Sequence, residues 1–145
     1  MDDSPTPPPP PGKAWRIAVV DDYAIIRAVF KSLVEDDPAL EFLWSASSLT
    51  EARSNLHRSI PDLLIVDITL PDGEGYELIT ETLARLPDLR VLVVSSREGE
   101  EHARRALDCG ARGYLPKSSS PDDIVNAISR IQQGGTCFKC LHPCG

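Results

Sequence analysis

The sequence PDLLIVDITLPDG, at residues 61–73, contains the strand from which the fold can be inferred. Four apolar residues at 63–66 run directly into Asp67, and turn-forming residues follow at 71–73. An uninterrupted apolar run of this length is typical of a strand that is covered on both faces. The stretch therefore predicts a buried strand that brings one carboxylate to the edge of a sheet.

Strand and helix patterns alternate five times along the chain. Apolar strand signals lie at 17–20, 42–44, 63–66, 91–94 and 112–115, and helical patterns lie at 25–34, 49–56, 76–86, 98–109 and 121–131. Alternation of this kind, with three continuous apolar strands, is typical of a parallel sheet between two layers of helices. We therefore predict an α/β fold with a doubly wound, five-stranded parallel sheet and helices on both faces.

Several side chains indicate how the helices begin, end and pack. The first helix has apolar residues spaced to cover one face, and the fourth has only a modest buried stripe; these sets are Ile25, Ile26, Val29, Phe30, Leu33 and Val34, then Ala103, Ala106 and Leu107. Residues 48–51 fit a capping box, and Gly110 is well placed as a left-handed C-cap. Ser120 and Pro121 are expected to start the last helix.

Composition narrows the class of protein. With 145 residues, the chain is long enough for one domain with a core of its own. The formal net charge of −7 argues against direct binding of nucleic acid. Neither an apolar run long enough to cross a bilayer nor the apolar stretch of a signal peptide is evident. We therefore expect no membrane association and a cytoplasmic location.

The chain divides into three parts by composition. Residues 1–13 are rich in proline and are expected to form a disordered or polyproline II leader, with a proline-binding partner as the alternative. Residues 14–135 are expected to form the folded domain. Residues 136–145 are expected to form a tail rich in cysteine.

The tail leaves three interpretations open. Cys137, Cys140, His142 and Cys144 supply four soft ligands of the kind that zinc prefers, although they are crowded into eight residues. A redox or intermolecular disulfide role is the second interpretation, and a tail without a role is the third.

Polar side chains follow four of the predicted strands. In a parallel sheet the C-terminal strand ends share one edge, where open α/β folds bind ligands. That edge would collect Asp21, Asp22, Asp67, Ser95 and Lys117, each of which taken singly could be only a cap, turn or loop residue. Three adjacent carboxylates repel each other, and Mg²⁺ with oxygen ligands would remove the repulsion. A cation and a lysine around one nucleophilic carboxylate suit a phosphoryl group, which Ser95 could hydrogen-bond.

Over residues 15–135 this set resembles the receiver domain of response regulators in two-component signalling. The matching residues are Asp21, Asp22, Asp67, Pro71, Gly75, Ser95, Tyr114 and Lys117. The resemblance implies the flavodoxin-like receiver fold. It also implies that Asp67 accepts a phosphoryl group, that Mg²⁺ is held by Asp21, Asp22, Asp67 and the backbone carbonyl of Thr69, that Ser95 and Lys117 contact the phosphoryl oxygens, and that Ser95 and Tyr114 form the switch.

Partners are also implied by the resemblance. The phosphoryl donor would be a histidine kinase or a histidine phosphotransfer protein, and the output would pass to an effector or separate output protein, with a phosphorylation-dependent homodimer as a further option. The segment GARGYL at 110–115 resembles receivers joined to a LuxR-type helix-turn-helix domain. We expect that output domain to be missing, since the residues after Gly135 are too few for three helices.

A few positions call for comment against the family pattern, and two alternatives compete with a phosphorylated receiver. Ser118 stands where many receivers have proline, and Thr69 and Arg97 occupy positions that tune dephosphorylation in the family. A receiver would not be a turnover enzyme, although it catalyses its own phosphoryl transfer. The first alternative is a pseudo-receiver that docks partners without phosphorylation. The second is a phosphatase of the haloacid dehalogenase type, which needs an acid two residues after the nucleophile, where this chain has Thr69.

Overall fold

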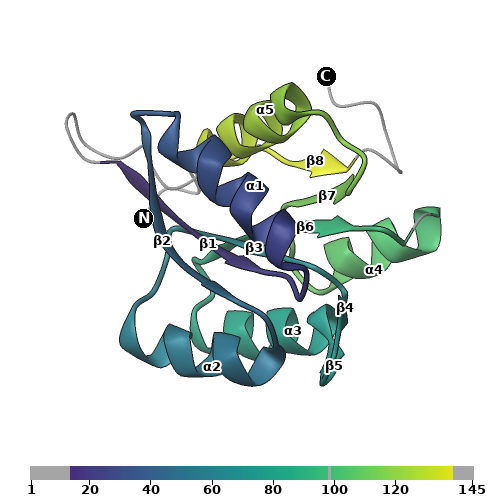
Figure 1. Cartoon of the computed structure of the whole chain (residues 1–145). Coiled ribbons are helices and arrows are strands. Elements are labelled where there is room, and N and C mark those ends of the chain that lie inside the picture. Colours follow the sequence, from purple (N-terminus) through teal and green to yellow (C-terminus); the bar gives the residue numbers. More distant parts are fainter. Residues whose placement is uncertain (1–13, 98, 139–145) are drawn as a thin grey trace, which may run out of the picture.

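A six-stranded parallel sheet forms the centre of the protein (Figure 1). The computed structural model describes residues 14–97 and 99–138. The strand order is β2-β1-β3-β6-β7-β8, and the strands are β1 (Trp15–Val20), β2 (Leu40–Ala46), β3 (Leu63–Val66), β6 (Arg90–Ser95), β7 (Gly113–Pro116) and β8 (Cys137–Phe138). A separate two-stranded hairpin consists of β4 (Thr69–Leu70) and β5 (Gly73–Glu74).

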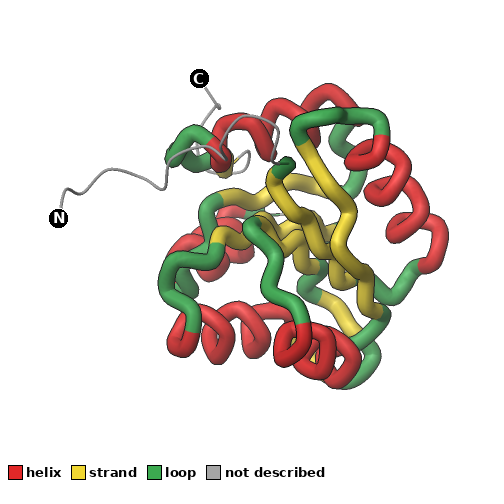
Figure 2. Tube along the Cα trace, turned by 90° about the vertical axis from the view of Figure 1, so that its left-hand side faces the viewer, coloured by secondary structure: helices red, strands yellow, loops and turns green. Residues whose placement is uncertain are grey.

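Helices cover both faces of this sheet, as Figures 1 and 2 show. The helices among the described residues are α1 (Ala24–Glu35), α2 (Leu49–Arg58), α3 (Gly75–Arg85), α4 (Glu100–Asp108) and α5 (Pro121–Gln132). Apolar residues of α1 and α5 belong to one buried cluster, whereas those of α2, α3 and α4 belong to the other. The predicted α/β class, the parallel sheet and its two helical layers are thus confirmed.

Strand alternation divides the core into these two clusters. Along β1, Ile17 and Val19 face α1 and α5, while Ala18 and Val20 face the opposite layer. All four of these side chains are buried, because β1 lies inside the sheet between β2 and β3. This explains why the interior strands are uninterrupted apolar runs in the sequence.

The sheet has one more strand than the five predicted. Residues 137–138 form β8, which pairs in parallel with β7. They fall within the segment that was expected to be a tail. A two-residue strand carries no periodic pattern, so sequence analysis does not detect it. The leader at 1–13, Cys140, His142 and Cys144 lie outside the described residues.

Three apolar side chains expected in the core are exposed instead. Ile25 and Val29 of α1 are 73% and 46% exposed, and Leu107 of α4 is 41% exposed. The buried stripe of α1 is narrower than predicted, because Phe30 and Val34 alone are its fully covered side chains. In α4 the covered residues are Ala103 and Ala106. Across the described residues, none of the helices is long and apolar enough to span a membrane.

The helix boundaries follow the predicted caps with one difference. Ser48 caps α2 by accepting a hydrogen bond from the Glu51 amide, but Glu51 accepts from the Ser47 amide rather than completing the box. Asp72, in the turn between β4 and β5, also accepts from the α2 amides of Leu49 and Thr50. The hairpin is therefore fastened to the start of α2. Gly110, with φ of 102°, follows α4 as predicted.

Gly75 allows α3 to begin directly against the end of β3. Its amide donates a hydrogen bond of 2.7 Å to the Ile68 carbonyl. A Cβ at this position would collide with the Asp67 carbonyl oxygen and would lie 2.8 Å from Cγ1 of Val66. The absent side chain is what permits this close approach, which fixes the backbone that carries Asp67.

We predict that Gly75→Ala destabilises the protein by about 1–3 kcal/mol, because the added methyl group must displace the β3 end. Urea unfolding followed by circular dichroism measures this change. Thr80→Ala, at an exposed position of the same helix, is the matched control and should change stability by less than about 0.5 kcal/mol. Equal stability of Gly75→Ala and the unchanged protein would show that the approach is not tight.

Candidate functional site

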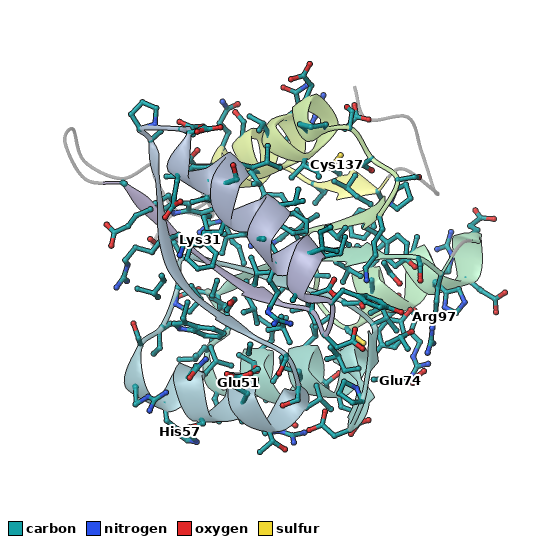
Figure 3. The ribbon with its side chains drawn as sticks, in the orientation of Figure 1. Lys31, Glu51, His57, Glu74, Arg97 and Cys137 are labelled. Carbon is teal, nitrogen blue, oxygen red and sulfur yellow. The ribbon has the colours of Figure 1, made fainter. Side chains whose placement is uncertain are left out.

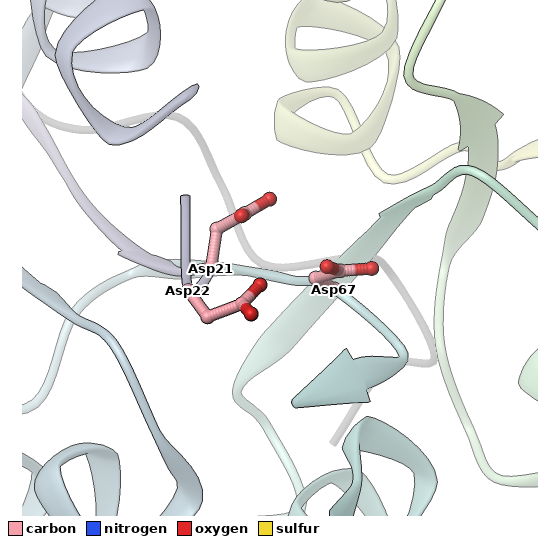
Figure 4. A group of neighbouring side chains, drawn as sticks. All are labelled: Asp21, Asp22 and Asp67. Atoms are coloured by element: carbon pink, nitrogen blue, oxygen red, sulfur yellow. The ribbon is translucent and has the colours of Figure 1, made fainter. Parts of the chain in front are cut away.

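Three carboxylates gather at the C-terminal edge of the sheet (Figure 4). Asp21 directly follows β1 and Asp67 directly follows β3, and the two strands are neighbours. Asp21 and Asp67 are only 2% and 3% exposed, whereas Asp22 is exposed. One oxygen atom from each carboxylate lies within 4.8 Å of the others. Oxygen donors at this spacing suit a hard divalent cation such as Mg²⁺.

Lys117 joins two of these carboxylates from the end of β7. Its Nζ lies 2.9 Å from Oδ2 of Asp67 and 3.0 Å from Oδ2 of Asp21. The same ammonium group lies 4.7 Å from the ring centroid of Tyr23. The Lys117 amide also donates to the Ser95 carbonyl, which fixes the strand end that carries the lysine. The largely buried ammonium group of Lys117 thus neutralises part of the negative charge of the acidic cluster.

Burial and pairing change the pKa values of this group in opposite ways. Burial raises the pKa of Asp67, the hydrogen bond from Lys117 lowers it, and the nearby charge of Asp21 raises it again, with a net upward shift. Burial lowers the pKa of Lys117, but its hydrogen bonds with Asp67 and Asp21 outweigh burial, so its pKa stays above the ordinary value. Lys117 therefore remains charged at neutral pH, while ionised Asp67 carries an energetic cost.

Two residues that sequence analysis missed hold Asp21 in place. The Tyr23 amide donates 2.9 Å to Oδ1 of Asp21, and Nη1 of Arg27 donates 2.8 Å to its backbone carbonyl. Both follow from the way α1 starts immediately after the acid pair. The only sequence signal for Arg27 is its place in the first turns of the helix, which does not reveal its partner.

The other predicted residues lie around the acidic cluster, some in direct contact with it and some connected through a neighbouring residue. Thr69 donates its amide to Oδ1 of Asp67 at 3.4 Å. Ser95 is fully buried at the end of β6, and its Oγ accepts from the Arg97 amide at 3.1 Å. Tyr114 is also fully buried, and its hydroxyl donates 2.7 Å to the Arg97 carbonyl. The Arg97 backbone therefore links Ser95 to Tyr114.

A second layer of charge lies beside the site, where Arg97 and Glu74 lie close together (Figure 3). Nη1 of Arg97 donates 2.8 Å to Oε2 of Glu74, and Nε donates 3.0 Å to Oγ1 of Thr69. Glu74 also pairs with Arg105 of α4 at 3.5 Å, and the Arg105 guanidinium lies 4.1 Å from the ring centroid of Tyr76. The Arg97 hydrogen bond lowers the pKa of Glu74 despite some burial. Sequence analysis did not identify Glu74.

The sequence-predicted residues are thus brought together to different extents. Asp21, Asp67 and Lys117 contact one another, and Asp22 lies in reach of the same cation position. Thr69 and Ser95 lie at the border of the cluster, and Tyr114 is connected to it through Arg97. Chemically, the arrangement offers a carboxylate nucleophile, cation ligands and a fixed positive charge.

Comparison with known proteins identifies a matching family and related structures. The model of the response regulator receiver domain matches residues 17–129. The DNA-binding transcriptional activator DevR/DosR of Mycobacterium tuberculosis is 33% identical over 119 residues, covering 82% of this chain and 55% of the activator. The chain thus spans about half the length of that relative.

Solved structures show the same architecture. A two-component response regulator of the LuxR family from an Aurantimonas species superposes with a TM-score of 0.81 at 31% identity, over 86% of this chain and 89% of that one. A CheY-like response regulator receiver domain protein from Methanospirillum hungatei gives a TM-score of 0.77 at 26% identity, over 84% and 96%.

We predict that Asp67→Asn raises the free energy of unfolding at pH 7 in the absence of divalent cations. Because the folded-state pKa of Asp67 is raised, the stability from this group is present below about pH 4 and is lost as the pH rises through the folded-state value. The variant should therefore gain most at neutral pH and lose that advantage in acid.

Urea unfolding at a series of pH values measures this difference. Asp88→Asn serves as the control. It removes one charge from an exposed position just before the start of β6, at the end of the strands away from the acidic cluster. A variant Asp67→Asn that is less stable than the unchanged protein at every pH would show that Lys117 overcompensates the cost of burial.

Proposed function

Because this chain belongs to the response regulator receiver family, a family of phosphorylation-dependent signalling domains, we propose that residues 14–135 form a receiver in which Asp67 accepts the phosphoryl group. The observation that carries the proposal is the position of Lys117, whose ammonium group contacts both Asp67 and Asp21 at the edge of the sheet. A fixed cation next to a buried carboxylate is the arrangement that phosphoryl transfer needs.

The donor set fits Mg²⁺ at this edge. Carboxylates of Asp21, Asp22 and Asp67 offer oxygen atoms within 4.8 Å of each other, and no soft ligand is among them. The Thr69 carbonyl is the proposed backbone ligand. When bound, Mg²⁺ would neutralise negative charge on the carboxylates and on the phosphoryl oxygens. The exposed position of Asp22 leaves the site accessible from solvent.

The side chains have separate roles in the proposed reaction. An oxygen of Asp67 attacks phosphorus, and the bond between phosphorus and the donor's histidine nitrogen breaks as the new bond forms. Lys117, already 2.9 Å from Asp67, is positioned to pair with a phosphoryl oxygen. Ser95 would donate a hydrogen bond from its hydroxyl to another phosphoryl oxygen, since its Oγ already accepts from the Arg97 amide. The donor is proposed to be a histidine kinase or a histidine phosphotransfer protein.

The output is proposed to follow the contacts that leave Ser95. Movement of Ser95 toward a phosphoryl group would draw the Arg97 amide with it, and the Arg97 carbonyl would then hold the Tyr114 hydroxyl in its buried position. A change at Tyr114 then reaches the surface formed by α4, β7 and α5. A population shift of this surface would alter the binding of an effector protein or of a second copy. No turnover reaction is proposed.

We predict that a small phosphodonor with Mg²⁺ adds one phosphoryl group to the chain, as measured by intact mass. Asp67→Asn should abolish the gain, because Asp67 is the proposed acceptor, whereas Asp21, which also pairs with Lys117, is proposed to hold the cation. Lys117→Gln should slow it strongly. Asp88→Asn, remote from the site, should behave like the unchanged protein.

The outcomes of this experiment separate the alternatives. An unchanged mass with every donor would contradict the proposal and favour a docking module that works without phosphorylation. Steady release of phosphate over many turnovers would favour a phosphatase with Asp67 as its nucleophile. An equal mass gain in Asp67→Asn would move the acceptor to another residue.

We also predict that Mg²⁺ raises the melting temperature. At a concentration about 100 times its dissociation constant, Mg²⁺ should increase the free energy of unfolding by about 2.7 kcal/mol. Asp22→Asn should reduce this Mg²⁺-dependent rise and leave the melting temperature without Mg²⁺ nearly unchanged, because the Asp22 side chain is exposed. Thermal scans with and without Mg²⁺ provide the measurement. If Asp22→Asn responds to Mg²⁺ like the unchanged protein, Asp22 is not a ligand.

A further inference from the structure

The outer edge of β7 is covered by a short strand from the segment that follows α5. Gly113 pairs with Cys137 and Tyr114 pairs with Phe138, and the Cys137 amide donates 3.0 Å to the Arg112 carbonyl. Figure 1 shows β8 as the last strand beside β7 and α5, and Figure 3 labels Cys137 at this place. β8 therefore places one side chain on each face of the sheet, Cys137 on one and Phe138 on the other.

The backbone after α5 is shaped to deliver this strand. Gly134 has φ of 94°, a left-handed conformation that favours glycine. Its amide donates to the Ile131 carbonyl at 2.9 Å, and the Gly135 amide donates to the Arg130 carbonyl at 2.8 Å. This pattern is a Schellman-type C-cap, which ends the helix and sets the direction of the chain that leaves it.

β7 is adapted to receive the strand. A Cβ at Gly113 would lie 2.9 Å from the Cys137 carbonyl oxygen and 2.8 Å from Cδ1 of Leu92. A side chain here would therefore push β8 away or disturb β6. Glycine at this position permits the two backbones to approach, in the way expected where one strand docks closely against another.

Both side chains of β8 are buried, and they enter different halves of the core. Cys137 is 3% exposed and belongs to the cluster that includes α5, while Phe138 is 7% exposed and belongs to the opposite cluster. In that cluster Phe138 lies with Tyr114 and with the small residues Ala103, Ala106 and Ala111.

This places Phe138 at the end of a chain of contacts from the site. Phe138 is the register partner of Tyr114, whose hydroxyl binds the Arg97 carbonyl, and the Arg97 amide binds Ser95. Tyr114 is fully buried while β8 is docked. The cover over Tyr114 and the arrangement around Ser95 therefore belong to one connected set of groups.

We propose that the outer edge of β7 is a strand-docking surface that residues 137–138 occupy in cis, and that its occupancy is coupled to the phosphoryl site through Tyr114. The coupling rests on the proposed function, whereas the docking does not. With Phe138 in place, Tyr114 stays buried and holds Arg97, which favours the arrangement around Ser95 that a phosphoryl group would use. By reciprocity, occupation of the phosphoryl site tightens the docking of β8.

The test compares Phe138→Ala with Phe42→Ala in the full chain. Phe42 is a half-buried phenylalanine of β2, at the opposite edge of the sheet, and it matches the change in side-chain size. Hydrogen–deuterium exchange is measured for the β7 amides, and the affinity for beryllofluoride with Mg²⁺, a phosphoryl mimic, is measured by titration. If Phe138→Ala folds poorly, Phe138→Leu serves in its place. It keeps a smaller apolar side chain and should give a weaker effect in the same direction.

We expect Phe138→Ala to accelerate exchange in β7 and to weaken beryllofluoride binding about fivefold or more, within the range of typical coupling between sites. Phe42→Ala should do neither. Unchanged exchange in β7, or an equal effect of Phe42→Ala, would overturn the docking of β8. Faster exchange with unchanged beryllofluoride affinity would overturn the coupling.

Failure of the proposed function gives a different result. If the unchanged protein binds no beryllofluoride, the phosphoryl site and the coupling both fail. The exchange measurement then still decides whether β8 docks on β7, because it requires no phosphoryl group or cation.

Discussion

The ion pairs of Lys117 with Asp67 and Asp21 are the interaction on which this edge of the structure depends. Two nearly buried carboxylates side by side would be costly without a positive charge between them. The parallel sheet meets this need, because β1, β3 and β7 all end at the same edge. Burial still raises the pKa of Asp67, so the pairing offsets only part of the cost. The remaining cost is what a cation or a phosphoryl group with its cation would change.

The surroundings of this pair divide into a rigid part and a part held by few contacts. Gly75 packs α3 tightly against the backbone of Asp67, and Asp72 fastens the β4–β5 hairpin to α2. The loop after β6 is different, because its described hydrogen bonds to Ser95, Thr69, Glu74 and Tyr114 all run through Arg97. That residue binds Ser95 and Tyr114 through its backbone, and Thr69 and Glu74 through its side chain. A movement of Arg97 would therefore change several contacts at once, including the position of the Glu74 carboxylate that also pairs with Arg105.

The sequence contains enough information for the sheet and for the main acidic site, but not for the contacts around them. Asp67 and Lys117 follow apolar strands, and the edge they share is a consequence of parallel topology. Glu74 and Tyr23 have no such signal, because charged and aromatic residues in loops have many conceivable partners until the fold brings one close. The exposure of Ile25 has a similar origin: helical spacing shows which residues share a face, but the width of the buried stripe depends on what packs against it. β8 was missed because two residues show no periodicity.

β8 also resolves a problem that the strand order creates. Without it, β7 would be an edge strand with unpaired backbone groups next to Tyr114, and such edges are open to pairing with other chains. The short strand covers that edge with backbone pairing and with the Phe138 ring, while Gly113 makes the approach possible. The cover is small, since two residues supply all of it among the described part of the chain. Phe138 is the register partner of Tyr114 and lies in the same buried cluster, so a change at Tyr114 would reach this cover directly. The position of β8 is thus explained by the edge that β7 would otherwise expose.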